Sequence, residues 1–209
     1  MLEIFPQLAT ERLDLIEIKP FHQMDFFNVF KNEKVARFYN IPQFREPKEA
    51  KVYLDLFELR FKMKTGIRWG IALKGQNNII GTIGFNSFQK NHKGNFAYDL
   101  HFDFWNKGIV TEAAKEILNY AFQHLALNRA EAEVMIGNTG SERVLQKLGF
   151  TFEGVVRDGM FMDGNYYDIK LFSLLRKDPI IAREDKGSDG LVGKFLPKIF
   201  KRTFLNPSR

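Results

Sequence analysis

The sequence predicts a single mixed α/β domain over residues 1–178, followed by a basic linker and tail over 179–209. The order of the patterns is the first reason. Strand-like segments joined by a hairpin signal come early, and strands that alternate with helices follow. Composition is the second reason, because 44% of the 209 residues are hydrophobic and 22 are Phe. A chain of this length and composition can bury a substantial core.

The first half of the domain is predicted to hold three strands and two helices. "RLDLIEI" (12–18) alternates between apolar and polar residues as a half-buried strand does. Helical periodicity follows over 21–32 and 47–64. "RWGIALK" (68–74) and "IIGTIGFN" (79–86) are apolar strands, and the "GQNN" between them is typical of a hairpin turn.

The second half alternates strands and helices. The predicted elements are a strand over 95–102, a helix over 111–125, a strand over 129–136, a helix over 141–148, and strands over 151–158 and 166–175 joined by a turn at Asp163–Gly164. Two of these strands run through a turn into a helix N-terminus. Backbone N–H groups at such N-termini bind anions, and α/β proteins place ligands beyond the carboxyl ends of neighbouring parallel strands.

Charge and residue usage exclude several classes of function. Residues 176–209 carry 9 basic and 4 acidic side chains, whereas residues 1–175 carry 22 and 21. The domain itself therefore gives no sign of a nucleic-acid face. The chain has no Cys, so disulfides, thiolate metal sites and a cysteine nucleophile are excluded. The four His show no metal-ligand spacing. No apolar run is long enough to span a membrane and no signal peptide is evident, so we expect a cytoplasmic protein.

Three stretches resemble one known family. "YDLHFDFWNKGIVTEA" (98–113), "NTGSERVLQKLGFTFEG" (138–154) and "DGNYYD" (163–168) are similar to motifs of the GNAT superfamily of acyl-coenzyme A N-acyltransferases. The resemblance is to its ribosomal-protein N-terminal acetyltransferase branch. It implies a central, mostly antiparallel twisted sheet that is splayed at a parallel strand pair and flanked by helices. It also implies direct acetyl transfer from acetyl-coenzyme A to a primary amine, without a metal.

The resemblance assigns the first helix N-terminus to the coenzyme. The pyrophosphate of coenzyme A would be held by backbone N–H groups and by the helix dipole. The residues concerned are Lys107, Gly108, Ile109, Val110 and Thr111. This loop departs from the family twice: Asn106 replaces a usual Gly, and Val110 stands where Gly or Ala is usual.

The resemblance gives the second helix N-terminus two roles. Asn138 would hydrogen-bond the pantetheine arm, and Ser141 would lie near the sulfur as a donor to the departing thiolate. Both residues also suit a helix N-terminus for structural reasons alone. Thr139 and Glu142 have the spacing of a capping box.

Acetyl transfer to an amine also needs a group that accepts the amine proton. Alternation along strand 95–102 places Asp99 and His101 on one polar face. We expect Asp99, acting through a water molecule, as the proton acceptor and His101 as the second candidate. The alternative is a solvated sheet face on which Asp99 is a surface residue.

The acceptor amine is left open between several classes. We expect a peptide or protein N-terminal α-amino group, whose pKa near 7.7–8.0 makes it easier to deprotonate than a lysine. Its cleft would lie between the two central strands, with walls from helix 47–64 and the Asp163–Gly164 turn. The alternatives are a small-molecule amine (aminoglycoside, polyamine or amino acid) and a catalytically weak coenzyme-binding module. The tail over 191–209 has five basic residues and no acid, which suits weak contact with an anionic membrane or a ribosome or, alternatively, no partner at all.

Overall fold

The computed structural model describes residues 4–162 and 164–180. The predicted tail beyond Ile180 and Asp163 of the predicted turn lie outside the described residues. Within them, no helix has the length and hydropathy that crossing a bilayer requires.

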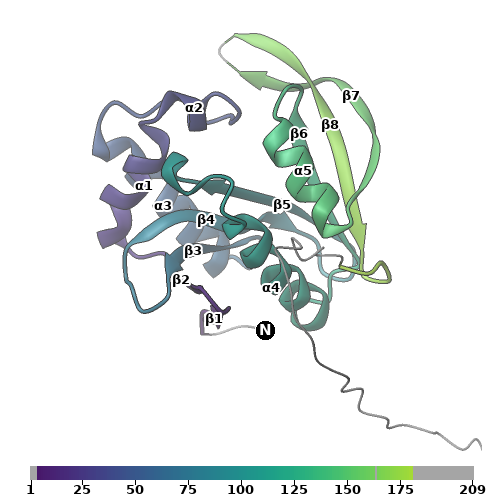
Figure 1. Ribbon diagram of the computed structural model, residues 1–209, viewed down its shortest axis with the longest axis horizontal. Coiled ribbons are helices and arrows are strands. Elements are labelled where there is room, and N and C mark those ends of the chain that lie inside the picture. The colour runs from purple at the N-terminus through teal and green to yellow at the C-terminus, as the bar shows by residue number, and fades with distance from the viewer. Residues whose placement is uncertain (1–3, 163, 181–209) are drawn as a thin grey trace, which may run out of the picture.

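One sheet of eight strands forms the centre of the domain, in the order β1-β2-β3-β4-β5-β6-β8-β7 (Figure 1). The strands are β1 (Leu8–Ala9), β2 (Leu13–Glu17), β3 (Ile67–Leu73), β4 (Ile79–Phe88), β5 (Lys93–Leu100), β6 (Arg129–Met135), β7 (Thr151–Met162) and β8 (Asn165–Leu175). Neighbouring strands are antiparallel except for β5 and β6, which are parallel. This confirms the mixed, mostly antiparallel sheet that the sequence and the resemblance predicted.

The parallel pair separates soon after it begins. β5 and β6 are paired only where 93–95 face 129–131. Beyond that point β5 continues along β4 and β6 continues along β8, so the two strands diverge. In Figure 1, β6, β8 and β7 accordingly turn away from β5. The splay leaves the carboxyl end of β5 without a strand partner on one side.

Helices cover both faces of the sheet (Figure 1). They are α1 (Gln23–Phe30), α2 (Glu33–Ala36), α3 (Pro47–Lys62), α4 (Ile109–His124) and α5 (Thr139–Leu148), with short 3-10 turns η1 (Pro20–His22) and η2 (Phe102–Phe104). α4 and α5 share one core with the sheet, in which Ile117 and Leu118 pack with Trp69. α1, α2 and α3 form a second, aromatic core around Phe26 and Phe30.

Most predicted elements are present with shifted ends, and two short ones were missed. The sequence did not predict β1 or α2. α4 begins at Ile109 rather than at 111, because the side chains of Ile109 and Val110 are buried in the core as part of its first turn. α5 begins at Thr139 rather than at 141, and its N-cap is Asn138, so the predicted Thr139 capping box is wrong.

Candidate active site

The splay between β5 and β6 opens a cleft of about 300 Å³. Its lining comes from α2 and the residues after it, the end of β5, the loop that leads into α4, the first turn of α4, and one side of α5 with its N-cap. The residues predicted to bind the coenzyme all lie in this lining: Lys107, Gly108, Ile109, Val110, Thr111, Asn138 and Ser141. The two helix N-termini singled out in the sequence therefore meet at one cavity.

The first turn of α4 presents unpaired amides to this cleft. The amide of Glu112 is the one that donates to the Gly108 carbonyl, at 3.0 Å. The amides of Ile109, Val110 and Thr111 precede it and have no carbonyl to reach within the helix. Together with the helix dipole they form a site that favours negative charge.

The two departures from the family motif are accommodated by the backbone. Gly108 has φ 73° and Asn106 has φ 59°, both in the left-handed region. Asn is among the residues that enter this region most readily after Gly, so Asn106 keeps the turn that a glycine would make. Val110 is only 9% exposed and packs with the core, which explains why a larger side chain fits there.

Thr10 and Arg12, in the turn between β1 and β2, hold the same loop, and sequence reasoning missed these contacts. The Glu112 carboxylate accepts hydrogen bonds from Thr10 Oγ1 (2.5 Å), Arg12 N (2.9 Å) and Arg12 Nε (2.6 Å). Arg12 Nη1 also donates to the Lys107 carbonyl at 3.0 Å. Burial alone would raise the pKa of Glu112, but the Thr10 and Arg12 hydrogen bonds hold it below its ordinary value. Glu112 is therefore an anchor for the loop.

Tyr98 and Ser141 meet across the splay. The Tyr98 hydroxyl lies 2.7 Å from Ser141 Oγ and 3.3 Å from the Ser141 carbonyl oxygen. Ser141 N donates to Asn138 Oδ1 at 3.1 Å, so Asn138 caps α5 and fixes the start of the helix that carries Ser141. Burial raises the pKa of Tyr98, opposed by its hydrogen bond with Ser141. The phenol therefore keeps its proton at neutral pH.

Asp99 lies on the opposite face of β5 and is buried, at 2% exposure. Arg68 Nη2 donates to its Oδ2 at 2.6 Å, Thr82 N donates to Oδ1 at 2.8 Å, and Thr82 Oγ1 donates to Oδ2 at 2.6 Å. The interpretation of this face as solvated is wrong, because Thr82 of the neighbouring β4 and Arg68 of β3 fill it. Burial raises the pKa of Asp99, and the Arg68 guanidinium and the Thr82 hydrogen bonds oppose that rise. Asp99 nevertheless belongs to the cleft lining.

His101 does not join Asp99. β5 ends at Leu100, and His101 becomes the N-cap of η2, where its Nδ1 accepts the Asp103 amide at 3.3 Å. Its ring packs edge-on against Phe104. The strand alternation that would have placed it beside Asp99 stops one residue too early, so the structure does not bring His101 into the described lining of the cleft.

The predicted walls of the acceptor side are also different from those observed. Val35 of α2 and the following Phe38 and Tyr39 line the cleft on that side. Neither α3 nor Gly164 contributes to the described lining. The wall predicted from helix 47–64 is therefore formed by α2 and the residues after it. α2 has only four residues, too few to show a helical pattern in the sequence.

Charge on the other side of the cleft suits a phosphate-bearing ligand. Lys107 and Arg143 line it near the two helix N-termini, and Lys147 lines it from the last turn of α5. The unpaired amides of α4 and these cations together fit the diphosphate portion of coenzyme A. Among residues 4–162 and 164–180, no group of His, Asp and Glu side chains is arranged to hold a metal ion.

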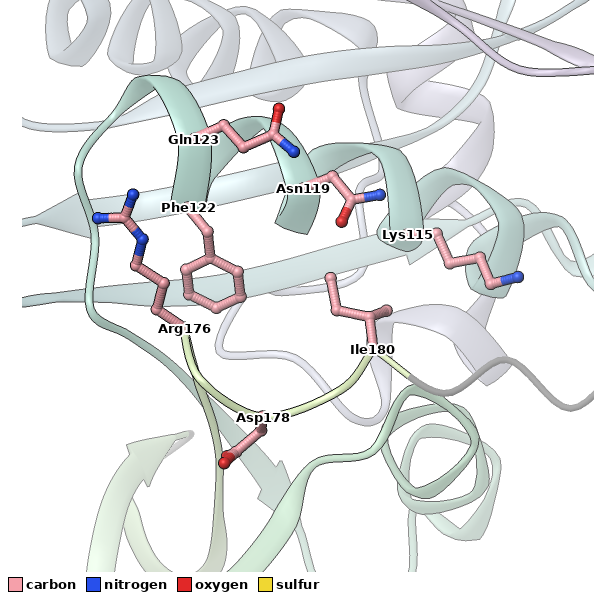
Figure 2. Close-up of a pocket in the computed structure, with 7 residues that line it drawn as sticks. All are labelled: Lys115, Asn119, Phe122, Gln123, Arg176, Asp178 and Ile180. Atoms are coloured by element: carbon pink, nitrogen blue, oxygen red, sulfur yellow. The ribbon is translucent and has the colours of Figure 1, made fainter. Parts of the chain in front are cut away.

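A second, larger surface cavity of about 520 Å³ lies away from this chemistry (Figure 2). It is bounded by Lys115, Asn119, Phe122 and Gln123 of α4 and by the chain after β8, represented by Arg176, Asp178 and Ile180. It contains neither a helix N-terminus nor a paired hydroxyl. The smaller cleft at the splay is therefore the candidate active site.

Comparison with known proteins gives the family. A model described as "Acetyltransferase (GNAT) domain" matches residues 12–151. The relative "Uncharacterized N-acetyltransferase YoaA" of Bacillus subtilis (strain 168) is 33% identical over 174 residues, 83% of this chain and 98% of the relative. "Spermidine N(1)-acetyltransferase" of Escherichia coli (strain K12) is 26% identical over 156 residues, 74% of this chain and 78% of that protein.

Solved structures share the fold. One is RimL, a ribosomal L7/L12 alpha-N-protein acetyltransferase in complex with coenzyme A, with a TM-score of 0.73 at 17% identity over 81% of this chain and 98% of that chain. At this identity the likeness concerns the fold, while the family match and the 33% identical relative concern the chemistry. The chain therefore belongs to the GNAT family of acetyltransferases, and its acetyl donor is acetyl-coenzyme A.

Proposed function

We propose that this protein acetylates the N-terminal α-amino group of a peptide or protein, with the transfer taking place in the cleft between β5 and β6. One observation carries the proposal. Residues from both faces of the sheet line a single cavity: Tyr98 and Ser141 on the α5 side, and Val35, Phe38 and Tyr39 on the α2 side. A donor and an acceptor that enter from opposite faces would meet at the end of β5.

On the donor side, the amides of 107–111 bind the pyrophosphate, and Lys107, Arg143 and Lys147 add positive charge. Asn138 Oδ1 is engaged by the Ser141 amide, so its Nδ2 remains to donate to the pantetheine arm. Ser141 Oγ is placed to donate a hydrogen bond to the sulfur as negative charge develops there. This assignment is supported by the position of all these residues in one lining.

On the acceptor side, Asp99 is the proposed acceptor of the amine proton, through a water molecule. Burial makes its carboxylate a stronger base than an exposed aspartate, although the Arg68 ion pair limits that gain. An α-amino group, with an ordinary pKa of about 7.7–8.0, is partly neutral at physiological pH and needs only a weak base. A lysine side chain, near 10.4, would need a stronger one.

A small polycationic amine is the second candidate acceptor, and the spermidine acetyltransferase relative favours it. The residues that line the acceptor side of the cleft favour a peptide instead. Its rings, Phe38 and Tyr39, line the same cavity as Asp99, and the Asp99 carboxylate accepts a hydrogen bond from Arg68. A polyamine would find no second carboxylate among the described lining residues.

A comparison of the two acceptor classes in separate reactions tests the proposal. Three acceptors are incubated separately with protein and acetyl-coenzyme A: a peptide with a free N-terminal Ser and no Lys, the same peptide with a blocked N-terminus and one Lys, and spermidine. Mass spectrometry with fragmentation locates the acetyl group. We expect acetylation of the free peptide at its first residue, with little product from the blocked one. Acetylation of spermidine with no peptide product would replace the peptide proposal by the small-amine one.

A further inference from the structure

Tyr98 is a cleft residue to which neither the sequence motifs nor the family match gives a role. It comes from β5, on one side of the splay, and Ser141 comes from α5, on the other. Its hydroxyl is within hydrogen-bond distance of two Ser141 atoms, Oγ at 2.7 Å and the carbonyl oxygen at 3.3 Å. The phenol is therefore a direct hydrogen-bond partner of the serine hydroxyl.

Two arrangements of the hydroxyl hydrogens are possible, and they have opposite consequences. If Tyr98 donates to the Ser141 carbonyl, Ser141 donates its own hydrogen to Tyr98 and has none left for the cleft. If Tyr98 donates to Ser141 Oγ, the serine hydrogen is free to point into the cleft. A hydrogen bond from Tyr98 to the Ser141 carbonyl would span 3.3 Å, which is long for an O–H···O bond and favours the second arrangement.

We propose that Tyr98 is a positioning residue that donates a hydrogen bond to Ser141 Oγ and thereby directs the Ser141 hydroxyl hydrogen at the sulfur of the departing thiolate. This inference rests on the proposed role of Ser141 in the acetyl transfer. A hydrogen bond received by Oγ also makes the serine hydroxyl a better donor, because it disperses the negative charge that builds on that oxygen.

The alternative chemical role, a proton relay from Tyr98 through Ser141 to sulfur, is disfavoured by the surroundings of the phenol. Such a relay would break the Tyr98 O–H bond and leave a phenolate. Tyr98 lies beside Phe96, and burial raises its pKa, so the charged form is costly there. Tyr98 acts as a hydrogen-bond donor that keeps its proton throughout.

The test is a double-mutant cycle on turnover. Tyr98→Phe removes only the hydroxyl, and Ser141→Ala removes only Oγ, since the Asn138 cap bonds to the Ser141 backbone amide. We expect each single change to lower kcat by about tenfold to a hundredfold while changing the KM for acetyl-coenzyme A by less than about threefold. In the Ser141→Ala background, Tyr98→Phe should then have almost no further effect.

Tyr120→Phe is the matched control. Tyr120 lies on α4 against Trp69, outside the described lining of the cleft, and its change should leave kcat unaltered. Independent, multiplicative losses for Tyr98→Phe and Ser141→Ala would overturn the proposal, as would an unchanged or faster Tyr98→Phe enzyme. The cycle can be measured with any amine that the protein acetylates. It therefore still tests the role of Tyr98 if the acceptor proves not to be a peptide. Full turnover in Ser141→Ala would instead remove the proposed role of Ser141, and this inference with it.

Discussion

Tyr98 and Asp99 are neighbours in β5, and their side chains leave opposite faces of the sheet. Tyr98 reaches Ser141 on the α5 side, whereas Asp99 reaches Arg68 and Thr82 on the α3 side. Arg68 in turn lies over the ring of Phe57 at 5.3 Å. A step of one residue along β5 thus connects the proposed donor side of the cleft with the proposed acceptor side.

Removing one partner of the Arg68–Asp99 ion pair should be far more destabilising than removing both. The exposed fractions of the two side chains are 6% and 1%. Asp99→Asn leaves the guanidinium buried without its carboxylate, so we expect the free energy of unfolding to fall by about 3–5 kcal/mol in urea titrations. Arg68→Met combined with Asp99→Leu removes both charges and should recover most of that loss.

Two comparisons complete this experiment. Lys51→Ala breaks an exposed ion pair with Asp55 and should change the free energy of unfolding by no more than about 0.5 kcal/mol. The restabilised double variant also tests Asp99 as proton acceptor, because its folding is no longer in question. It should turn over at least about a hundredfold more slowly than the wild type. A double variant with near-normal turnover would show that Asp99 takes no proton.

At the scale of elements, the start of α1 is fastened to the β3–β4 hairpin. His22, only 1% exposed, donates from Nε2 to the Asn77 carbonyl at 2.9 Å, and its Nδ1 accepts the Lys19 amide at 2.9 Å. Asp25 accepts hydrogen bonds from Ile79 N and Asn78 Nδ2. A doubly protonated ring could not accept from Lys19, so this joint requires a neutral His22.

This joint should make stability depend on pH. Burial lowers the pKa of His22, although the Asn77 hydrogen bond and Asp25 oppose the shift. Below about pH 6.5 the unfolded chain therefore binds a proton that the folded chain does not. Stability contributed by His22 is present above that pH and is lost as the pH falls below it. Urea unfolding at pH 7.5, 6.0 and 5.0 should show this decrease in the wild type and a smaller one in His22→Gln.

His124 provides the control for that measurement, because it is exposed at the end of α4. His124→Gln should follow the wild-type pH dependence. If His22→Gln and the wild type lost stability in parallel between pH 7.5 and 5.0, a neutral His22 would not be what holds α1 to the hairpin.

Elements with a regular pattern could be predicted from the sequence, and those whose identity depends on tertiary contacts could not. The hairpin at 75–78 and the long helices have periodic apolar residues, so their places were predicted within a few residues. β1 and α2 are too short to show any period. The end of β5 was misplaced because Phe102 continues the apolar alternation but turns into η2, next to Trp105.

The residues of the candidate site also fall into those that a local pattern predicts and those that depend on tertiary contacts. The coenzyme loop and Ser141 are local motifs, and they could be found in the sequence because a helix N-terminus is built from consecutive residues. Asp99 was recognised as unusual, but its partner Arg68 lies 31 positions earlier. The pairing of Thr82 with Asp99 depends on the register of β4 against β5, which alternation alone does not give. Tyr98 was given no role, because its partner Ser141 lies 43 positions later in the chain.

At the scale of the whole molecule, the sheet separates two hydrophobic cores. Residues from both sides of the sheet line the same cleft at the splay between β5 and β6. The α4 and α5 core holds the two helix N-termini, and the α1–α3 core holds the aromatic wall of the acceptor side. The proposed reaction therefore requires that acetyl-coenzyme A occupies the cleft between β5 and β6.

Gly140 gives direct access to that claim. It lines the cleft in the first turn of α5, and a Cβ placed there would meet only Asn138 Oδ1, at 3.8 Å. A side chain at 140 would thus extend into the cleft without displacing protein atoms. Gly140→Ala should bind coenzyme A with normal affinity, because a methyl group occupies little room in the cleft. Alanine also favours the helix, so this variant should fold well. Gln146→Leu, an exposed change on the same helix, is the control for added apolar surface.

The deciding measurement is the Kd for coenzyme A by isothermal titration calorimetry with Gly140→Leu, alongside its thermal unfolding. We expect the Kd to rise at least about tenfold, which corresponds to about 1.4 kcal/mol, while the Tm of Gly140→Leu stays at or above that of the wild type. Gly140→Ala and Gln146→Leu should bind as the wild type does. Coenzyme binding of normal affinity by a folded Gly140→Leu protein would contradict the account, because the donor would then lie outside the cleft.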